Sequence, residues 1–345
     1  MSRKPAHPPP PPPPPPSMRA SSKKPTNLAA PSYPTGSFGN GIEVEFLLSS
    51  RSTNSAKTIR EFSRMVAASY NDYLARVASG QHPKMHNAID EAYLGPQFAE
   101  WSLDSDSTIE MPNRGGAPSF PQVNANTSCG THVHLSRVEG YSLADLKKIC
   151  QSIIHFEPAF EALLPEDRLS NEYARSNWLD NANFGHRSLS RKQRIAAIQR
   201  SSSMRELMFG WNFLYLLNSP NGAIEFRRGA ACSSAQQAFV YIEIAMSFIE
   251  AAIQLGSPEN LERAPGTVDG LKQFISAARL SNNVPGLYDS RYLSLFFGNK
   301  TDGTFREPKP LGKLSAYQLN KLNKKKEDDK KNVAMVKMLH EPYWS

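Results

Sequence analysis

The chain is 345 residues long and carries a formal net charge of +8 at pH 7. This length suffices for one large domain or two ordinary ones. No stretch reaches the roughly 18 to 20 consecutive apolar residues of a membrane span, and the N-terminus leads into proline rather than into the apolar segment of a secretory signal. The three cysteines, an odd number, cannot form a disulfide framework. We therefore expect a cytoplasmic protein with no membrane partner.

The positive charge is concentrated at the two ends of the chain. Residues 1–34 contain five Lys or Arg and no acidic residue, and residues 301–345 contain ten basic and six acidic residues. The remaining 25 basic and 26 acidic residues lie in 35–300 and nearly cancel. A weak contact between the tails and a polyanion remains open. The body has no basic excess, so we do not expect nucleic acid as a partner.

The first 34 residues are of low complexity and include an unbroken run of nine prolines, Pro8–Pro16. Such a run favours polyproline II and cannot build a hydrophobic core, so we expect a disordered proline-rich leader. One interpretation is a docking segment for an SH3, WW or profilin-type partner. The other is a solubilising leader without a dedicated partner, and the sequence does not separate the two.

The body is predicted to begin with a strand over residues 41–46. Glu43 and Glu45 alternate there with Ile42, Val44 and Phe46. Successive side chains of a strand point to opposite faces, so the two carboxylates share one face and the three apolar side chains should pack against a core. An exposed strand with ordinary surface glutamates would show the same pattern.

The later elements mix strands and helices without a regular βαβ alternation. An amphipathic helix is predicted over 57–79, and Ser142 with Asp145 forms a capping signal for a second helix. In chain order we expect a helix at 57–79, strands at 98–103, 107–111 and 129–136, a helix at 142–164, a polar irregular segment at 165–202, a hairpin of 209–217 with 223–227, helices at 235–254 and 266–277, and a charged helix at 314–331. This order predicts an α+β body over 35–300, followed by a basic, partly helical tail over 301–345.

His132 and His134 share one face of the predicted strand at 129–136, with Val133 on the other face. One imidazole can ligate a divalent ion while the second contacts a phosphate or orients a substrate. Two alternatives stay open. A His-x-His strand also occurs in zinc amidohydrolases, and two polar residues can simply occupy an open sheet face. Neighbouring Cys129 is expected to be a packing residue rather than a nucleophile.

Glu225 and Arg227 form the third pair with a spacing of two. They combine a carboxylate that can bind a metal with a guanidinium that can grip phosphate through two hydrogen bonds. Arg228 should point the opposite way and meet solvent. An ion pair within the sheet is the alternative. If the three strands share one sheet, its polar face would suit Mg²⁺ or Mn²⁺ together with phosphate.

In this order the motifs resemble those of the amidoligase family, relatives of glutamine synthetase and glutamate–cysteine ligase. The similarity spans roughly residues 36–255. It rests on Gly41-Ile42-Glu43-Val44-Glu45, Trp101 with Asp104-Ser105-Asp106-Ser107, Cys129-Gly130-Thr131-His132-Val133-His134, the loop residues Arg168, Asn171 and Tyr173, and Glu225-Phe226-Arg227. The resemblance implies a glutamine synthetase-like curved antiparallel sheet with helices packed on one face. It also implies an ATP-dependent carboxylate–amine ligase that forms an amide through an acyl phosphate.

The resemblance further implies a role for each matching residue. Glu43, His132 and Glu225 would hold one Mg²⁺ (or Mn²⁺) at the ATP phosphates, and Glu45 would help hold a second ion. His134 and Arg227 would contact the transferring phosphoryl group, and Arg168 would take part in nucleotide binding. The substrates would be a small-molecule or peptide acid and an amine.

The chain departs from the family pattern between Ser107 and Cys129. Family members carry a strand there with a further glutamate, whereas here only about twenty residues remain. Glu110 is the candidate replacement for that metal ligand, or the strand is missing. A catalytically degenerate binding or adaptor protein is therefore the first alternative to the ligase, and a zinc-dependent amide hydrolase is the second.

Overall fold

The computed structural model describes residues 36–48, 58–77, 82–95, 99–106, 123–169, 171–180, 190–200, 210–217, 222–278, 290–300, 303–311, 313–324 and 327. The described residues all belong to one unit, Thr35–Ser345, which is separate from Met1–Pro34. The proline-rich leader, the strand expected at 107–111 and Glu110 lie outside the described residues.

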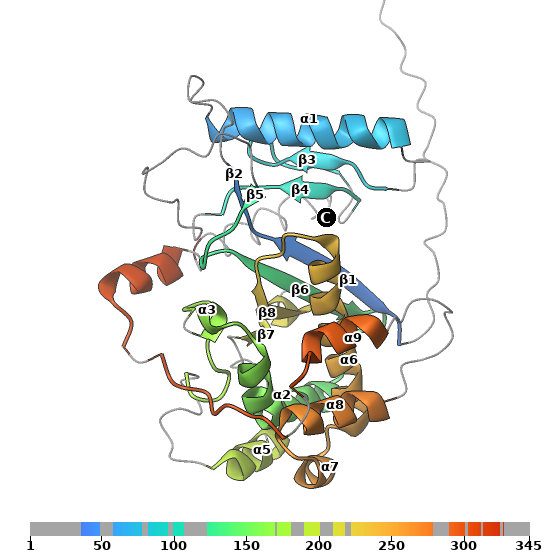
Figure 1. The fold of residues 1–345 in the computed structure, drawn as a ribbon, viewed down its shortest axis with the longest axis vertical. Helices are drawn as coiled ribbons and strands as arrows, with labels where there is room; N and C mark the ends of the chain where they lie inside the picture. Colours follow the sequence, from blue (N-terminus) through green and yellow to red (C-terminus); the bar gives the residue numbers. More distant parts are fainter. Residues whose placement is uncertain are drawn as a thin grey trace, which may run out of the picture. The chain divides into compact units, whose positions relative to one another are not determined.

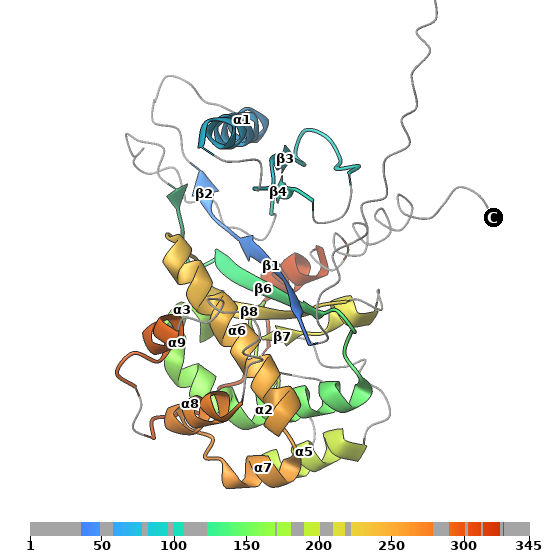
Figure 2. The same ribbon diagram turned by 90° about the vertical axis from the view of Figure 1, so that its right-hand side faces the viewer.

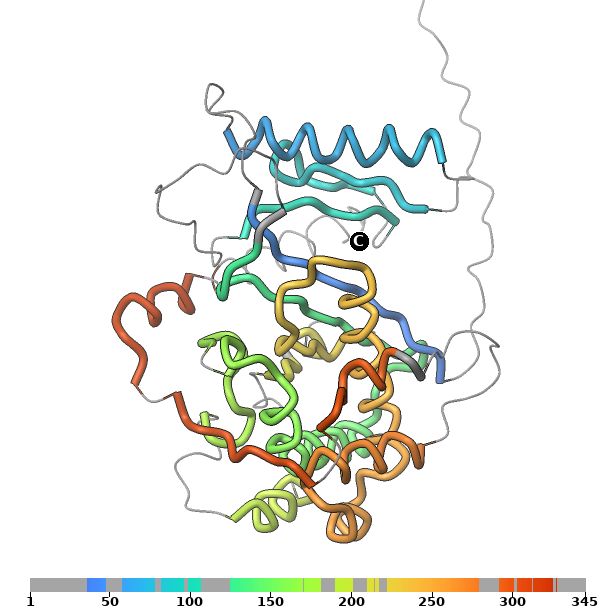
Figure 3. Tube along the Cα trace, viewed as in Figure 1, coloured from blue at the N-terminus to red at the C-terminus, as the bar shows by residue number. Residues whose placement is uncertain are grey.

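The main sheet joins strands that are far apart in the sequence (Figures 1 and 3). Its strand order is β1-β6-β8-β7, and all three pairings are antiparallel. The two smaller sheets are antiparallel β2-β5 and parallel β3-β4. The strands are β1 (Phe38–Val44), β2 (Leu47–Leu48), β3 (Met85–Asn87), β4 (Trp101–Leu103), β5 (Val123–Asn124), β6 (Gly130–Arg137), β7 (Trp211–Asn212) and β8 (Ile224–Ala230).

The helices begin at sequence signals that satisfy their free N–H groups. Ser142 and Asp145 form the predicted capping box at the start of α2, and Ser234, Ser257 and Thr267 cap α6, α7 and α8. The helical elements are α1 (Ile59–Val77), α2 (Leu143–Leu163), α3 (Glu166–Leu169), α5 (Arg191–Arg200), the 3₁₀ turn η1 (Leu214–Leu217), α6 (Ala235–Leu255), α7 (Pro258–Arg263), α8 (Val268–Ala277) and α9 (Ser290–Phe297).

The hydrophobic core lies between the main sheet and helices α2, α6 and α8 (Figure 2). Val133, Leu135, Ile224 and Phe226 on β6 and β8 are fully buried. They meet Phe156 and Phe160 of α2 and Phe248 of α6 in the same apolar cluster. The alternation of these strands therefore sends apolar side chains to the helix-covered face and leaves the opposite face to polar residues.

The α+β class is confirmed, and several predicted elements are found close to their expected bounds: α1, β6, α2, α6 and α8. The predicted antiparallel pair β7–β8 is present, but β7 is much shorter than the expected strand at 209–217, because residues 214–217 form the 3₁₀ turn η1. The segment 165–202 is less irregular than predicted, because it contains α3 and α5. Helix α5 follows a weak pattern: only Arg194, Ile195 and Ile198 are buried in it. Helix α5 has no clear apolar stripe, so we attribute its stability to its packing against α2.

The prediction that Val44 packs against the core is wrong. Val44 is 37% exposed, and Ile42 and Phe46 are only partly buried. Strand β1 is an edge strand of the main sheet, whereas β6 and β8 occupy its centre. The described helices cover the central strands more completely than the edge.

Residues 303–311, which the sequence analysis assigned to a tail, contact the body. The Arg306 N–H donates to the Pro158 carbonyl at 3.0 Å, and the Val268 N–H donates to the Thr304 carbonyl at 2.8 Å. Within the described part of the following segment, residues 316–324 are helical.

Among the described helices, α6 alone is long and apolar enough for a membrane span. In its most apolar window 44% of the residues are buried, and the helix contacts α2, α8, α9 and β6. No such segment is expected from the apolar runs of the sequence. One helix of this kind is only a weak indication of a span, because a core helix has the same composition.

Candidate metal and phosphate site

The strand register places the three predicted pairs beside one another on the polar face of the main sheet. Glu43 of β1 lies opposite His132 of β6, and His134 of β6 lies opposite Glu225 of β8. Directly opposed residues of antiparallel strands carry their side chains on the same face. The sheet therefore brings together side chains that are up to 184 positions apart in the sequence, from Glu43 to Arg227.

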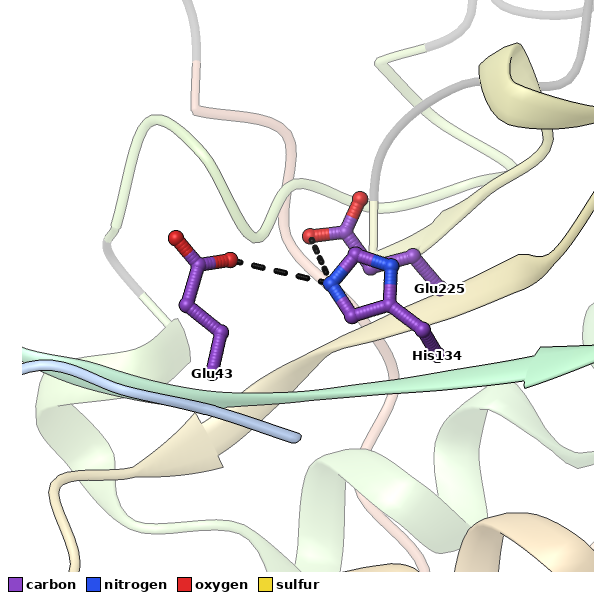
Figure 4. Close-up of side chains that lie close together, drawn as sticks. All are labelled: Glu43, His134 and Glu225. Carbon is purple, nitrogen blue, oxygen red and sulfur yellow. Dashed lines mark ion pairs between the residues drawn. The ribbon is translucent and has the colours of Figure 1, made fainter. Parts of the chain in front are cut away.

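Both histidines face the same two carboxylates. His134 Nε2 lies 3.7 Å from Glu43 Oε2 and 3.9 Å from Glu225 Oε1, as the dashed lines in Figure 4 mark. His132 Nδ1 lies closer still, at 2.9 Å from Glu43 Oε2 and 3.4 Å from Glu225 Oε1. Glu43 and Glu225 are thus the shared carboxylates of the site.

Glu45 adds a third carboxylate on the other side of His132. Its Oε1 lies 4.0 Å from His132 Nε2, and its Oε2 accepts the Gly130 N–H at 2.6 Å. Although β1 ends at Val44, the Glu45 N–H still donates to the Gly130 carbonyl at 3.0 Å. The ladder therefore holds Glu45 at the edge of the site.

Two overlapping sets of side chains can each offer three ligand atoms that all lie within 4.8 Å of one another. One set is Glu43, His134 and Glu225, and the other is Glu43, Glu45 and His132. The resemblance had grouped Glu43 and Glu225 with His132 and given His134 a phosphate contact. The first set has His134 in the place that the resemblance gave to His132, and His132 belongs instead to the second set with Glu45.

Charge and burial act against each other at these groups. Burial disfavours the charged form of His132, but the carboxylates of Glu43, Glu45 and Glu225 outweigh it and raise the pKa of this imidazole. Burial raises the pKa of Glu45, which His132 and the Gly130 N–H only partly offset. At Glu225 the balance reverses, since Arg227 and the two histidines lower its pKa despite complete burial.

Arg227 reaches the same carboxylate from within its own strand. Its Nε lies 2.8 Å from Glu225 Oε1, and this partner raises the pKa of the guanidinium against the opposing effect of burial. The side chain of Arg227 is 14% exposed, so part of it borders the open face. A fixed cation beside metal-type carboxylates is the arrangement that phosphate binding needs.

The prediction that Arg228 meets solvent is wrong. Its side chain does point away from Arg227, but it is only 3% exposed. It forms ion pairs with Glu161 and, at 3.9 Å, with Glu157 Oε1, both on α2 beneath the sheet. The alternation rule gave its direction, but it could not show that a helix covers this face.

Arg227 and Arg228 form a bulge in β8. Thr131 pairs with Gly229 and Val133 pairs with Phe226, so two residues of β8 oppose the single residue His132. Arg168 Nη2 donates to the Arg227 carbonyl at 2.8 Å, and Arg168 Nη1 donates to the Cys129 carbonyl at 3.3 Å. Arg168 is 1% exposed, so its guanidinium here serves the backbone of β6 and β8, and nucleotide binding by this residue stays a prediction.

Two residues at the site were missed by the sequence analysis. Asn212 of β7 lies opposite Glu225, is buried, and donates from Nδ2 to Glu225 Oε2 at 2.7 Å. The Tyr215 ring lies edge-on to His134 with 5.3 Å between centroids. The predicted hairpin implied a partner opposite Glu225, but its register was needed to identify Asn212.

The structure bears on Asp106 and Cys129, two of the remaining predicted residues, but not on Glu110. The charge of Asp106 contributes to the raised pKa of Glu45, so the segment after β4 reaches the neighbourhood of the site. Glu110 lies outside the described residues. Cys129 is fully buried with a raised thiol pKa, which agrees with a packing role.

Comparisons with known protein-family models, with curated proteins and with solved structures found no match for this chain.

Proposed function

We propose that this protein is an ATP- and Mg²⁺-dependent carboxylate–amine ligase on a glutamine synthetase-like sheet. The observation that carries the proposal is the row Glu43, His132, His134 and Glu225 across three adjacent strands, with Arg227 beside it. The same residues supply the ordered motifs on which the family resemblance rests.

The donor chemistry fits a divalent ion. Carboxylate oxygens are the ligands that Mg²⁺ and Mn²⁺ prefer, and the two ligand sets around Glu43 leave room for imidazole nitrogen as well. Bound Mg²⁺ would neutralise phosphate charge during phosphoryl transfer. Within the chain, Arg227 would hold a phosphate oxygen. The burial of Glu45 and Glu225 would keep these two metal ligands fixed in orientation.

Such a site suits acyl activation because phosphoryl transfer needs positioned cations more than a protein nucleophile. ATP would convert the acid substrate into an acyl phosphate by transfer of its γ-phosphoryl group. An amine would then attack the acyl carbon and release inorganic phosphate, with loss of one proton from the nitrogen. Overall, one ATP would yield ADP, phosphate and one amide.

The two histidines also favour a second candidate, a zinc-dependent amide hydrolase. Zn²⁺ is bound by imidazole together with carboxylate in hydrolytic sites. The two candidates differ in the resident metal, because stoichiometric zinc is expected in the isolated hydrolase and not in the ligase. Metal analysis of the purified protein separates them.

The decisive experiment measures Mg-ATP binding and then ADP release across a panel of acids and amines. Wild-type protein should bind Mg-ATP and release ADP only when both substrates are present, whereas Glu225→Ala should lose both properties. Binding without turnover on any pair would support the degenerate adaptor. No Mg-ATP binding by folded wild-type protein would end the ligase proposal.

A further inference from the structure

The carboxylate of Glu225 is divided between two environments. Its Oε1 faces the site, 2.8 Å from Arg227 Nε and 3.4 Å from His132 Nδ1. Its Oε2 faces the neighbouring strand, where Asn212 Nδ2 donates to it at 2.7 Å. Glu225 is completely buried and Asn212 is 4% exposed, so water does not replace this amide easily.

The contact is built by the strand register rather than by a flexible loop. Asn212 lies directly opposite Glu225 in the β7–β8 pair, and Trp211 beside it lies opposite Phe226 in the core. The N–H and carbonyl of Trp211 are both bound by the buried Asn177 side chain, at 2.9 and 3.0 Å. Asn177 thus binds only the backbone of Trp211, and the β7–β8 register is what sets the Asn212 amide opposite Glu225.

We propose that Asn212 is a specificity-determining residue that makes the site select Mg²⁺ over Ca²⁺. This inference rests on the metal site of the proposed function. By binding Oε2, Asn212 leaves Glu225 to offer a metal one oxygen, Oε1. Bidentate chelation would require both oxygens to face the ion, and the Asn212 hydrogen bond opposes that rotation.

The two ions respond differently to such a constraint. Mg²⁺ demands octahedral geometry with ligands at about 2.0 to 2.1 Å and usually takes single oxygens from carboxylates. Ca²⁺ accepts six to eight oxygens at about 2.3 to 2.6 Å, and a bidentate carboxylate supplies two of them. A Glu225 held to one oxygen therefore disfavours Ca²⁺, and a Glu225 free to rotate would admit it.

The test is a calorimetric titration of the full chain with Mg²⁺ alone and with Ca²⁺ alone. Asn212→Leu keeps the branched shape of the side chain and removes the donor, although leucine is larger than asparagine. Loss of a side chain that orients a ligand costs about 10- to 100-fold in metal affinity, so we expect the Mg²⁺/Ca²⁺ affinity ratio to fall by about tenfold or more. Asn212→Ala is the second variant if the leucine does not fold.

Asn177→Ala is the matched control. It removes two buried hydrogen bonds to the same strand without touching Glu225, so it should lower stability and leave the ion preference unchanged. An Asn212 variant that retains the wild-type ratio, or an Asn177→Ala protein with an equal shift, would overturn the specificity role while metal binding stands. Failure of the wild type to bind either ion would instead remove the metal site itself and this inference with it.

Discussion

Gly130 shows how little space single residues have around the site. A Cβ built there would lie 2.9 Å from Arg168 Nη2 and 3.1 Å from His132 Nε2. The backbone of β6 thus passes close to two side chains that converge from different elements. The Gly130 N–H also donates to Glu45 Oε2. Gly130 therefore leaves room for the two nearby side chains and also takes part in a hydrogen bond of the site.

Replacing Gly130 by Ala should therefore push Arg168 away from the β8 bulge. We expect a loss of about 1 to 3 kcal/mol in the free energy of unfolding, as for other overpacked sites, together with weaker Mn²⁺ binding. Urea unfolding and calorimetry measure the two effects. Gly41→Ala is the control, because its Cβ would meet His134 Cβ at an ordinary 3.6 Å. If the two variants had the same free energy of unfolding and the same Mn²⁺ affinity, Arg168 would be shown to move aside without cost.

His132 should make both stability and metal binding depend on pH. Its folded pKa is raised above 6.5, so the stability contributed by the imidazolium is complete below pH 6.5 and is lost as pH rises through the folded pKa. A metal ion competes with the same proton, so Mn²⁺ affinity should rise over this window.

Titrations of Mn²⁺ between about pH 6 and 8.5, a range that spans the ordinary histidine pKa, measure this dependence. His132→Asn should flatten it. His155→Asn is the comparison, since His155 contacts the Ala264 carbonyl rather than the site carboxylates. A pH slope retained in His132→Asn would contradict the assignment.

At the scale of elements, β8 connects the polar and the buried faces of the main sheet. Arg227 faces the site, and the next residue, Arg228, lies on the buried face in an ion-pair network with Glu157 and Glu161 of α2. Burial raises the pKa of Glu157 to about 7, although Arg228 opposes the rise. This network joins the central strand to α2 directly beneath the candidate site.

Arg228→Met should destabilise the fold strongly because it leaves Glu157 and Glu161 without their buried cation. Breaking a buried pair in this way costs about 3 to 5 kcal/mol. Lys192→Met is the control: its partner Glu262 and its own side chain are 56% and 80% exposed, so the cost should stay below about 1 kcal/mol. Chemical denaturation compares them, and similar midpoints would mean that the α2 carboxyls are neutralised without Arg228.

At the scale of the whole molecule, the described core and candidate site belong to the unit Thr35–Ser345. The charge surplus and the nine-proline run belong to Met1–Pro34 or to the C-terminal end. Metal binding and folding should therefore be separable from any contact that the proline-rich leader makes.

Removal of residues 1–34 should leave the thermal midpoint and the Mn²⁺ affinity unchanged. It should abolish binding to SH3, WW or profilin-type modules if the leader is a docking segment. Differential scanning calorimetry and a pull-down with these modules test the two statements. A lower midpoint would show that the leader contributes to the folded unit.

The period-two pattern was enough to group the site residues by face. Glu43, Glu45, His132, His134, Glu225 and Arg227 could be chosen from spacing, because a strand alternates strictly. The same rule failed to place Val44, which lies on an edge strand, and to foresee the burial of Arg228 beneath α2. Burial depends on which element covers a face, and local alternation does not contain that information.

The amino-acid pattern was sufficient to predict the α+β class, the main helices with their caps, and the side chains that share a face on each strand. These properties are local, since propensity, capping and alternation act over a few residues. The folded chain was needed to find the strand order β1-β6-β8-β7, the bulge that Arg168 binds, and the position of Asn212 opposite Glu225. Those features depend on the pairing register of segments far apart in the chain, which packing of the whole core selects.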